Sequence, residues 1–283
     1  AAVTVRERYV QNRLIPNAIE PRAVFVMPIP ATGEFTLWST TQVPPLARVT
    51  LSGVTGIPEA KLRVIAPDVG GGFGSKLNVY AEEALGLAIA RRLDRAVKWT
   101  ETRSEGYVST IHGRDQIQEI ELAATAEGKI TAARTKLTAA MGAYLQLVTP
   151  GVPLLGAWLY AGCYGVEGYS FECTGVFTNT VPTDAYRGAG RPEATYAIER
   201  AVDALARKLG KDPVEVRRDN FIREFPATLA AGLTVDPGRF EALLALAPRA
   251  PSSGDRRAGP RRRRRPAAHN PTGRGLPAPP RLV

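Results

Sequence analysis

The chemistry of this sequence centres on main-chain amide groups, because residues 69–76 read Val-Gly-Gly-Gly-Phe-Gly-Ser-Lys. Glycine has no Cβ and tolerates positive φ, so a bulky ligand can approach the peptide N–H groups directly. A helix is expected over residues 77–93, and its first N–H groups and positive dipole end favour an anion, or oxo and sulfur atoms. A tight turn without a ligand is the alternative; four glycines around one Phe favour a ligand site.

The standard nucleotide-binding loops do not fit this turn. A phosphate loop would need Gly at the position of Ser75 and Ser or Thr at that of Leu77. The dinucleotide fingerprint, counted from Gly70, finds Ser75 at its third small position, and no acidic residue follows at the expected distance. A different class of ligand is therefore expected.

Two further segments have a similar character. Residues 183–193 (Thr-Asp-Ala-Tyr-Arg-Gly-Ala-Gly-Arg-Pro-Glu) form a second glycine-rich turn, and Pro192 suits the first turn of the helix that follows. Upstream of the first turn, a strand delivers Ser39-Thr40-Thr41-Gln42 to a loop that ends in two prolines. A Gln at a strand end is usually a solvated loop residue, and its place just before the glycines makes Gln42 a candidate for ligand contact.

In this chain order, Ser-Thr-x-Gln, Gly-Gly-Gly-Phe-Gly-x-Lys and Tyr-Arg-Gly-x-Gly resemble the molybdopterin-binding subunit of the xanthine dehydrogenase/aldehyde oxidase family. That family includes the large chain of aerobic carbon monoxide dehydrogenase. The resemblance covers residues 1 to about 246. It implies an α+β fold, namely the family's first molybdenum-cofactor-binding domain, with mixed strands and with helices after the glycine-rich turns. It also implies that the parent protein is a molybdenum hydroxylase, an oxidoreductase that takes its oxygen from water.

The resemblance implies a set of cofactor-contacting residues and no metal-ligating side chain, because the pterin dithiolene holds the molybdenum. Gln42 would hydrogen-bond an oxo ligand of the metal, Phe73 and Gly74 would line the metal site, and Arg187 would contact the pterin. Lys76 receives no role. The predicted cofactor-contacting residues are Gln42, Gly72, Phe73, Gly74, Arg187, Gly188, Ala189 and Gly190. The cofactor is molybdopterin, with the cytosine dinucleotide form as one alternative.

The chain departs from relatives of known substrate at several positions. Carbon monoxide dehydrogenases carry a copper-binding Cys where Gly188 stands, so carbon monoxide oxidation is disfavoured. Purine oxidases place a Glu at the position of Leu77, an Arg at that of Leu155 and a stacking Phe at that of Ala189. A site without these groups is more open and less polar, which favours aldehydes or aromatic N-heterocycles as substrates.

The family's general-base Glu lies in a later Gly-x-Gly-Glu segment, which residues 1–283 do not match. Since the sequence also starts at Ala1 rather than Met, we expect a fragment with no catalytic residue, inactive alone. The resemblance implies iron–sulfur and FAD groups on partner subunits, and two Cys and two His leave no room for an iron–sulfur cluster in this chain. No apolar run is long enough to span a bilayer, and a cytoplasmic location is expected, with the periplasm as the alternative.

Hydrophobic patterning indicates the elements that position these turns. Helical spacing predicts helices over residues 43–54 and 194–209, and another that opens at residue 211. Residues 103–113 are polar and predict a loop. Alternation predicts strands over residues 3–11, 23–27, 35–39, 62–66, 97–100 and 169–179, and a hairpin over residues 116–125 and 129–144.

Residues 247–283 have a different composition. They contain ten Arg and one Asp, so they carry nine of the ten net positive charges, and their composition of Arg, Pro, Ala and Gly without periodicity predicts disorder. The predicted domains are therefore a molybdopterin-binding domain (1–246) and an Arg/Pro-rich tail (247–283), for which a frameshift is one explanation. Two other classes of function stay open: a module whose basic tail binds nucleic acid or another anionic partner, and a nucleotide-binding α/β enzyme.

Overall fold

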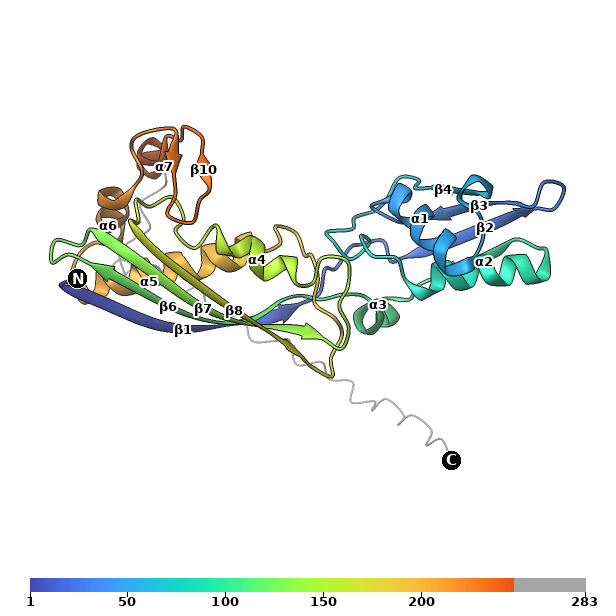
Figure 1. Ribbon diagram of the computed structural model, residues 1–283, viewed down its shortest axis with the longest axis horizontal. Coiled ribbons are helices and arrows are strands. Elements are labelled where there is room, and N and C mark those ends of the chain that lie inside the picture. Colours follow the sequence, from blue (N-terminus) through green and yellow to red (C-terminus); the bar gives the residue numbers. More distant parts are fainter. Residues whose placement is uncertain (247–283) are drawn as a thin grey trace, which may run out of the picture. The chain divides into compact units, whose positions relative to one another are not determined.

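The structure, a computed structural model, describes residues 1–246 (Figure 1). The predictions for residues 247–283, a disordered tail or a frameshift product, lie outside the described residues. Residues Ala1–Glu241 form one compact unit that contains two four-stranded sheets. A two-stranded ribbon, β9 (Ala227–Thr228) with β10 (Thr234–Val235), and helix α7 (Phe240–Leu246) come last among the described elements.

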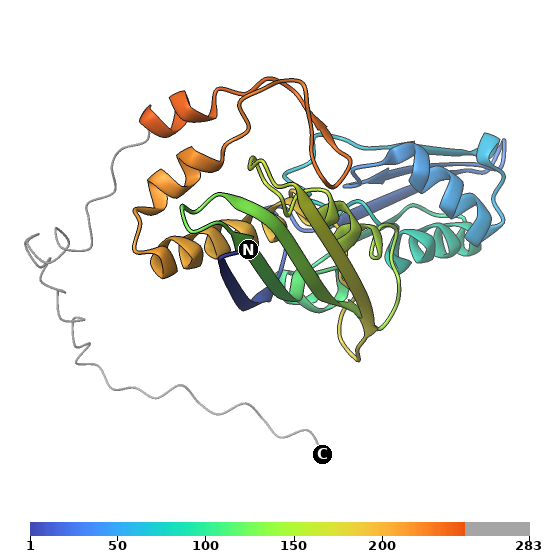
Figure 2. The ribbon, with the colours of Figure 1, turned by 60° about the vertical axis from the view of Figure 1, so that its left-hand side comes forward.

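The first sheet has the order β1-β6-β7-β8 and consists of β1 (Val3–Leu14), β6 (Gly113–Ala124), β7 (Ile130–Gly142) and β8 (Gly168–Phe177). Strands β1, β6 and β7 are antiparallel neighbours, which confirms the predicted hairpin, and β8 runs parallel to β7. Helix α5 (Arg191–Leu209) lies along one face of this sheet (Figures 1 and 2). Its apolar stripe, which includes Ile198 and Leu205, packs on inward-facing residues such as Ile120.

The second sheet has the order β4-β3-β2-β5 and consists of β2 (Ala23–Ile29), β3 (Glu34–Ser39), β4 (Leu62–Ile65) and β5 (Val97–Thr100). Helices α1 (Pro44–Thr55) and α2 (Ala81–Leu93) pack on it through a separate apolar core around Val26, Leu37 and Leu87. A short 3-10 turn, η1 (Glu59–Lys61), precedes β4. Mixed sheets with segregated helices confirm the predicted α+β fold.

Three shorter helices stand between the larger elements along the chain. They are α3 (Arg103–Ser109), α4 (Gly151–Ala157) and α6 (Pro213–Asn220). The prediction of a loop over residues 103–113 is wrong for α3, because the Thr102 side chain accepts from Glu105 N–H while Glu105 accepts from Thr102 N–H, and this capping box starts a helix in a polar sequence.

The helix after the first glycine-rich turn begins at Ala81 rather than at residue 77. Its N-terminus is capped from within the helix, because Glu83 Oε2 accepts the N–H of the N-cap residue Tyr80 at 2.9 Å. Glu83 is buried and also accepts from Ser39 Oγ at 2.6 Å; burial raises its pKa, and these hydrogen bonds oppose the rise. The expectation that this helix aims free N–H groups at the glycines is therefore wrong.

Candidate functional site

The first glycine-rich turn is irregular backbone between β4 and α2. It folds on itself, since Ser75 N–H donates to Gly72 O and Leu77 N–H donates to Gly74 O, both at 3.0 Å. Phe73 adopts a φ of 53° and Gly74 a φ of 106°. Positive φ is uncommon for a residue such as Phe, and here it turns a side chain that is 42% exposed away from the core.

Gln42 packs directly against this turn. Its main-chain N–H donates to Lys76 O at 2.8 Å, and its side-chain Oε1 accepts the Gly74 N–H at 2.9 Å. A Cβ placed on Gly72 would lie 2.3 Å from the same Oε1, so only glycine allows Gln42 to come this close. Because the Gly74 N–H can only donate, the Gln42 amide is oriented with its NH₂ group turned away from the turn.

The second turn, between β8 and α5, meets the first. Arg187 N–H donates to Phe73 O at 2.9 Å, and a Cβ on Gly74 would lie 1.7 Å from Ala185 O. The Arg187 guanidinium lies 5.9 Å from the centre of the Phe73 ring. The two turns, far apart in sequence, are therefore in direct backbone contact, as the motifs predicted. Their contact with a cofactor stays a prediction.

The glycines of the second turn also have internal packing reasons. Gly188 has a φ of 96°, and a Cβ there would lie 2.8 Å from the Pro192 ring. Gly190 is buried, and a Cβ there would lie 2.6 Å from both Gly156 N and Val152 O of α4. Ala189, between them, has a φ of 25°. The predicted residues of this turn are thus together, with Gly188 at the surface and Gly190 packed inward.

Arg114 supports the second turn from below. Its guanidinium pairs with Glu193 at 2.8 Å and donates to Arg187 O at 2.8 Å and Tyr186 O at 3.3 Å. It also stacks on the Tyr186 ring at 4.6 Å, and Glu193 is only 1% exposed. Arg114 reaches this position from a backbone with a φ of 66° at the start of β6. Arg114 therefore satisfies the carbonyl groups of Tyr186 and Arg187 and holds the second turn in place.

Asn78 and Asp184 join both turns to a third segment, residues 146–149. Asn78 donates to Asp184 Oδ2 at 3.3 Å and accepts the Leu147 N–H at 3.0 Å. Asp184, which is 1% exposed, also accepts the Val148 N–H at 3.2 Å. Burial raises the pKa of Asp184, and its hydrogen bonds oppose the rise. This side-chain pair fixes the relative position of three chain segments.

Hydrogen-bond donors are what remain free at this junction. Among residues 1–246, the N–H groups of Gly72, Phe73 and Gly188 have no acceptor, and neither does the Gln42 Nε2. In the same range, no group of three or more His, Cys, Asp and Glu side chains could hold a metal ion. The site can therefore bind a ligand rich in hydrogen-bond acceptors through peptide and amide donors, beside the exposed Arg187 guanidinium.

Sequence reasoning missed the residues that hold the turns in place. The pair of Arg114 with Glu193 joins residues 79 positions apart, and the contact of Glu20 with Gly70 joins residues 50 positions apart. No local sequence pattern reveals such contacts. Asp184 and Asn78 stand inside or beside the two motifs, which was the only available signal. His112 is held within the fold, with its Nε2 3.0 Å from Tyr107 O, and burial lowers its pKa.

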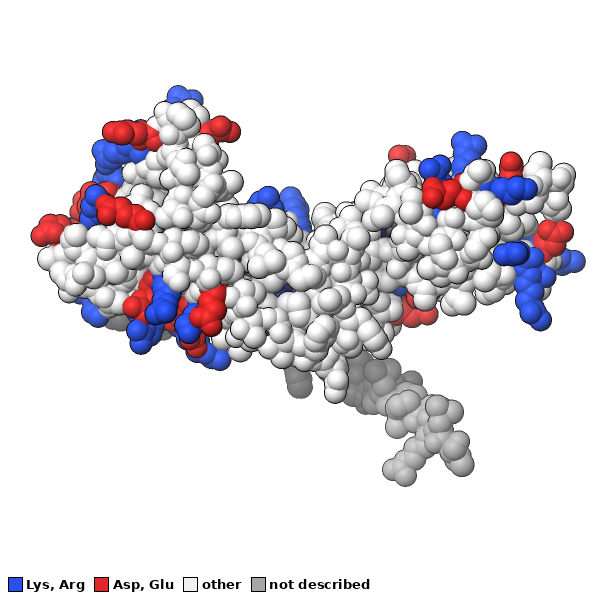
Figure 3. Space-filling model, in the orientation of Figure 1, with Lys and Arg blue, Asp and Glu red and all other residues white. Residues whose placement is uncertain are grey.

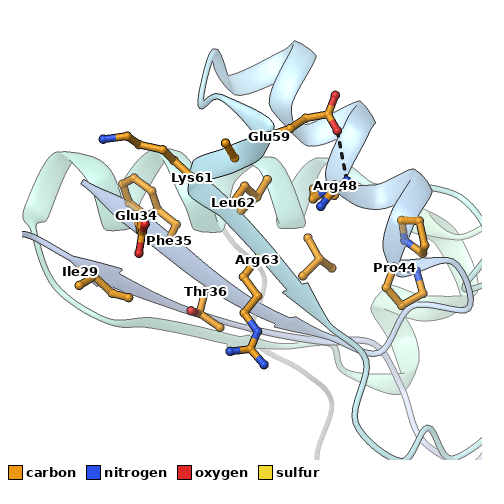
Figure 4. Close-up of a pocket in the computed structure, with 13 residues that line it drawn as sticks. Ile29, Glu34, Phe35, Thr36, Pro44, Arg48, Glu59, Lys61, Leu62 and Arg63 are labelled. Atoms are coloured by element: carbon orange, nitrogen blue, oxygen red, sulfur yellow. Dashed lines mark ion pairs between the residues drawn. The ribbon is translucent and has the colours of Figure 1, made fainter. Parts of the chain in front are cut away.

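Other surface features lie outside this junction. A hollow of about 560 Å³ beside β4 is lined by residues of β3, α1 and η1, including the ion pair of Arg48 with Glu59 at 3.5 Å (Figure 4). None of the predicted cofactor-contacting residues lines it. On the face drawn in Figure 3, acidic and basic side chains of the described residues are interspersed, without a broad area of one sign. None of the helices within residues 1–246 is long and apolar enough to cross a membrane.

A domain of two sheets whose glycine-rich turns meet in a cradle of main-chain donors defines a class of cofactor-binding domain. The family described as molybdopterin cofactor-binding domain matches residues 1–221. The chain belongs to this family, as its motifs indicated.

Individual relatives agree with this assignment. The chain is 37% identical over 249 residues to the carbon monoxide dehydrogenase large chain of Hydrogenophaga pseudoflava, covering 86% of this chain and 31% of that one. It is 38% identical over 209 residues to the nicotine 6-hydroxylase large subunit of Paenarthrobacter nicotinovorans, covering 72% and 25%. Quinoline 2-oxidoreductase from Pseudomonas putida 86 has a similar structure, with a TM-score of 0.83 and 34% identity over 87% of this chain and 32% of that one. The chain thus spans about a third of these relatives or less.

Proposed function

We propose that the two turns together hold a molybdopterin cofactor, with contacts from Gln42, Gly72, Phe73, Gly74, Arg187, Gly188, Ala189 and Gly190. The free donors support this proposal: three peptide N–H groups and the Gln42 NH₂ have no acceptor within residues 1–246, and the exposed guanidinium of Arg187 suits a phosphate or a pterin carbonyl. The residues present therefore fit an acceptor-rich group. When bound, that cofactor supplies the two-electron oxidation of a C–H bond with oxygen from water.

Within this proposal, each residue has a separate task. Gln42 has its Oε1 fixed by Gly74 and offers its NH₂ as a donor. The N–H groups of Gly72 and Phe73 extend this row of donors, and Gly188 offers another from the second turn. Arg187, stacked beside Phe73, neutralises negative charge on the ligand.

The parent protein is proposed to be a molybdenum hydroxylase of an aldehyde or an aromatic N-heterocycle. Two relatives are named for N-heterocyclic substrates, nicotine and quinoline. By the resemblance described above, carbon monoxide dehydrogenases carry a copper-binding Cys at the position of Gly188. Its absence here argues against carbon monoxide as the substrate. Because residues 1–283 lack a match to the general-base segment, this chain alone is proposed not to turn over.

The proposed assembly follows from the relatives, which are large chains of multi-subunit proteins. Iron–sulfur and FAD groups are proposed on separate partner subunits, and the cytosine dinucleotide is one alternative for the form of the pterin. The chain would work in the cytoplasm.

The experiment is to produce the full chain in a host that makes the molybdenum cofactor and to measure pterin and molybdenum per mole of chain. Gln42→Glu keeps the acceptor for the Gly74 N–H but loses both free donors and gains a negative charge. The control is Asn12→Asp, the same change from amide to carboxylate at an exposed position of β1 whose side chain makes no hydrogen bond within residues 1–246. We expect cofactor in the wild type and the control, and at least about a tenfold loss in Gln42→Glu, as for removal of hydrogen bonds to a charged ligand. A wild-type chain without pterin, or full retention in Gln42→Glu, would refute the proposal.

A further inference from the structure

Lys76, the last residue of the first motif, is buried in a way that needs an explanation. Its side chain is 2% exposed, and lysine is almost never buried to this extent unless it is paired. Its Nζ donates to Glu20 Oε2 at 2.9 Å, and Glu20 lies in the segment before β2. An ammonium group taken out of water is stable only with such a partner. The pair is thus a requirement of the fold at this place.

Glu20 also holds the start of the turn. The Oε2 atom that receives Lys76 accepts the Gly70 N–H at 2.7 Å, and Glu20 N–H donates to Gly70 O at 3.3 Å. A Cβ on Gly70 would lie 2.6 Å from the Glu20 Cβ, so glycine is needed for this approach. One carboxylate oxygen therefore links residue 70, where the glycines begin, to residue 76, where the motif ends.

The main chain of Lys76 holds Gln42. Lys76 O accepts the Gln42 N–H at 2.8 Å, and Gln42 Oε1 in turn accepts the Gly74 N–H at 2.9 Å. A continuous series of hydrogen bonds thus runs from Glu20 through Lys76 to Gln42 and back into the turn. Any shift of Lys76 moves both the Gln42 backbone and the point at which its side chain meets Gly74.

We propose that Glu20 and Lys76 are positioning residues whose ion pair closes the first turn at both ends and sets the direction of the free amide donors of Gln42. The positioning concerns this chain alone; its consequence, retention of the cofactor, rests on the proposed function. Burial alone would raise the pKa of Glu20, but the hydrogen bonds from Lys76 and Gly70 and the charge of Lys76 outweigh burial and lower it. The Glu20 carboxyl is therefore ionised at neutral pH.

The test is amide hydrogen exchange, read by NMR on the ¹⁵N-labelled full chain without cofactor. Lys76→Met removes the ammonium, and Glu20→Gln keeps an acceptor oxygen for Gly70 but removes the charge. We expect both variants to lower protection of the Gln42 and Gly74 amides by about tenfold or more, although neither amide bonds to the altered side chain. Glu172→Gln, in the exposed pair with Lys136, should leave these amides unchanged.

The double variant Lys76→Met/Glu20→Gln separates a coupled pair from two independent effects. We expect it to lose no more protection than Lys76→Met alone, because the two residues act as one unit. Unchanged protection at Gln42 and Gly74 in Glu20→Gln and Lys76→Met would overturn the proposal, as would loss confined to Gly70. Pterin content, measured in parallel, should fall in both variants; a wild type without pterin would refute the proposed function and leave the exchange result to decide this one.

Discussion

Replacing Gly74 by Ala is the most direct perturbation of the junction between the two turns. The φ of 106° lies in a region that an L-residue adopts at a cost of about 1–3 kcal/mol. The new Cβ would also lie 1.7 Å from Ala185 O, a main-chain atom that no side-chain rotation can move. The two turns must therefore separate until this contact approaches ordinary van der Waals distance.

This separation has a second cost. Phe73 O accepts the Arg187 N–H at 2.9 Å, and this hydrogen bond joins the same two turns within two residues of the clash. It is therefore lost as the turns move apart. Overpacking typically costs about 1–3 kcal/mol and a lost hydrogen bond about 1 kcal/mol. With the strain at residue 74, the expected loss in the free energy of unfolding is about 3–7 kcal/mol, a large share of a domain's stability.

Gly56→Ala is the matched control. Gly56 has a φ of 71° as the residue that ends α1, and a Cβ there would meet nothing within 4 Å. It therefore reports the backbone strain without the clash, about 1–2 kcal/mol. Urea unfolding of both variants, followed by circular dichroism, gives the difference. If Gly74→Ala costs no more than Gly56→Ala, the turns are not in the contact described here and the reasoning fails.

Three further predictions use the charged groups around the turns. Arg114→Met leaves the carboxylate of Glu193 buried and unpaired, so urea unfolding should show a loss of about 3–5 kcal/mol in the free energy of unfolding. The control Arg6→Met, in an exposed pair with Glu121, should cost under about 1 kcal/mol. Equal losses in the two variants would contradict the role given to Arg114. Because the pKa of Glu20 is lowered in the fold, its contribution is present above pH 4.5 and is lost as pH falls, so unfolding curves of wild type and Glu20→Gln should converge in acid. Asp184 has a raised pKa, so its contribution to stability depends on pH in the opposite direction. The contribution is present below pH 3.8 and is lost as pH rises through the higher pKa of the folded state. The free energy of unfolding of the wild type should therefore rise relative to that of Asp184→Asn as pH falls.

Local patterns were sufficient for the strands of the two four-stranded sheets, for the longer helices and for the two turns. Alternation predicted the β6–β7 hairpin because one face of that sheet packs on α5, and helical spacing predicted α5 because its apolar stripe is continuous. The capping box of Thr102 and Glu105 could have revealed α3, but the polarity of residues 103–113 suggested a loop.

What the sequence could not predict depends on contacts between distant segments. The late start of α2 follows from the Glu83 carboxylate, which is buried against Ser39 of another element. The positive φ of Phe73 follows from the second turn, which binds its carbonyl through Arg187. The partners Glu20 and Arg114 come from positions with no motif of their own. Each of these features is set by tertiary structure, which no window of neighbouring residues contains.

The glycines themselves are weaker evidence for a ligand than the motif suggests. Four of them leave room for another part of the same protein: Gly70 for Glu20, Gly72 for Gln42, Gly74 for Ala185 and Gly190 for α4. A glycine substitution would therefore disturb the fold whether or not a cofactor binds. The groups that separate the two cases are the donors without a partner within residues 1–246, because their removal leaves the hydrogen bonds within the described fold in place. Gln42→Glu removes such donors, adds a negative charge and keeps the contact with Gly74, and loss of pterin in that variant would consequently report binding rather than folding.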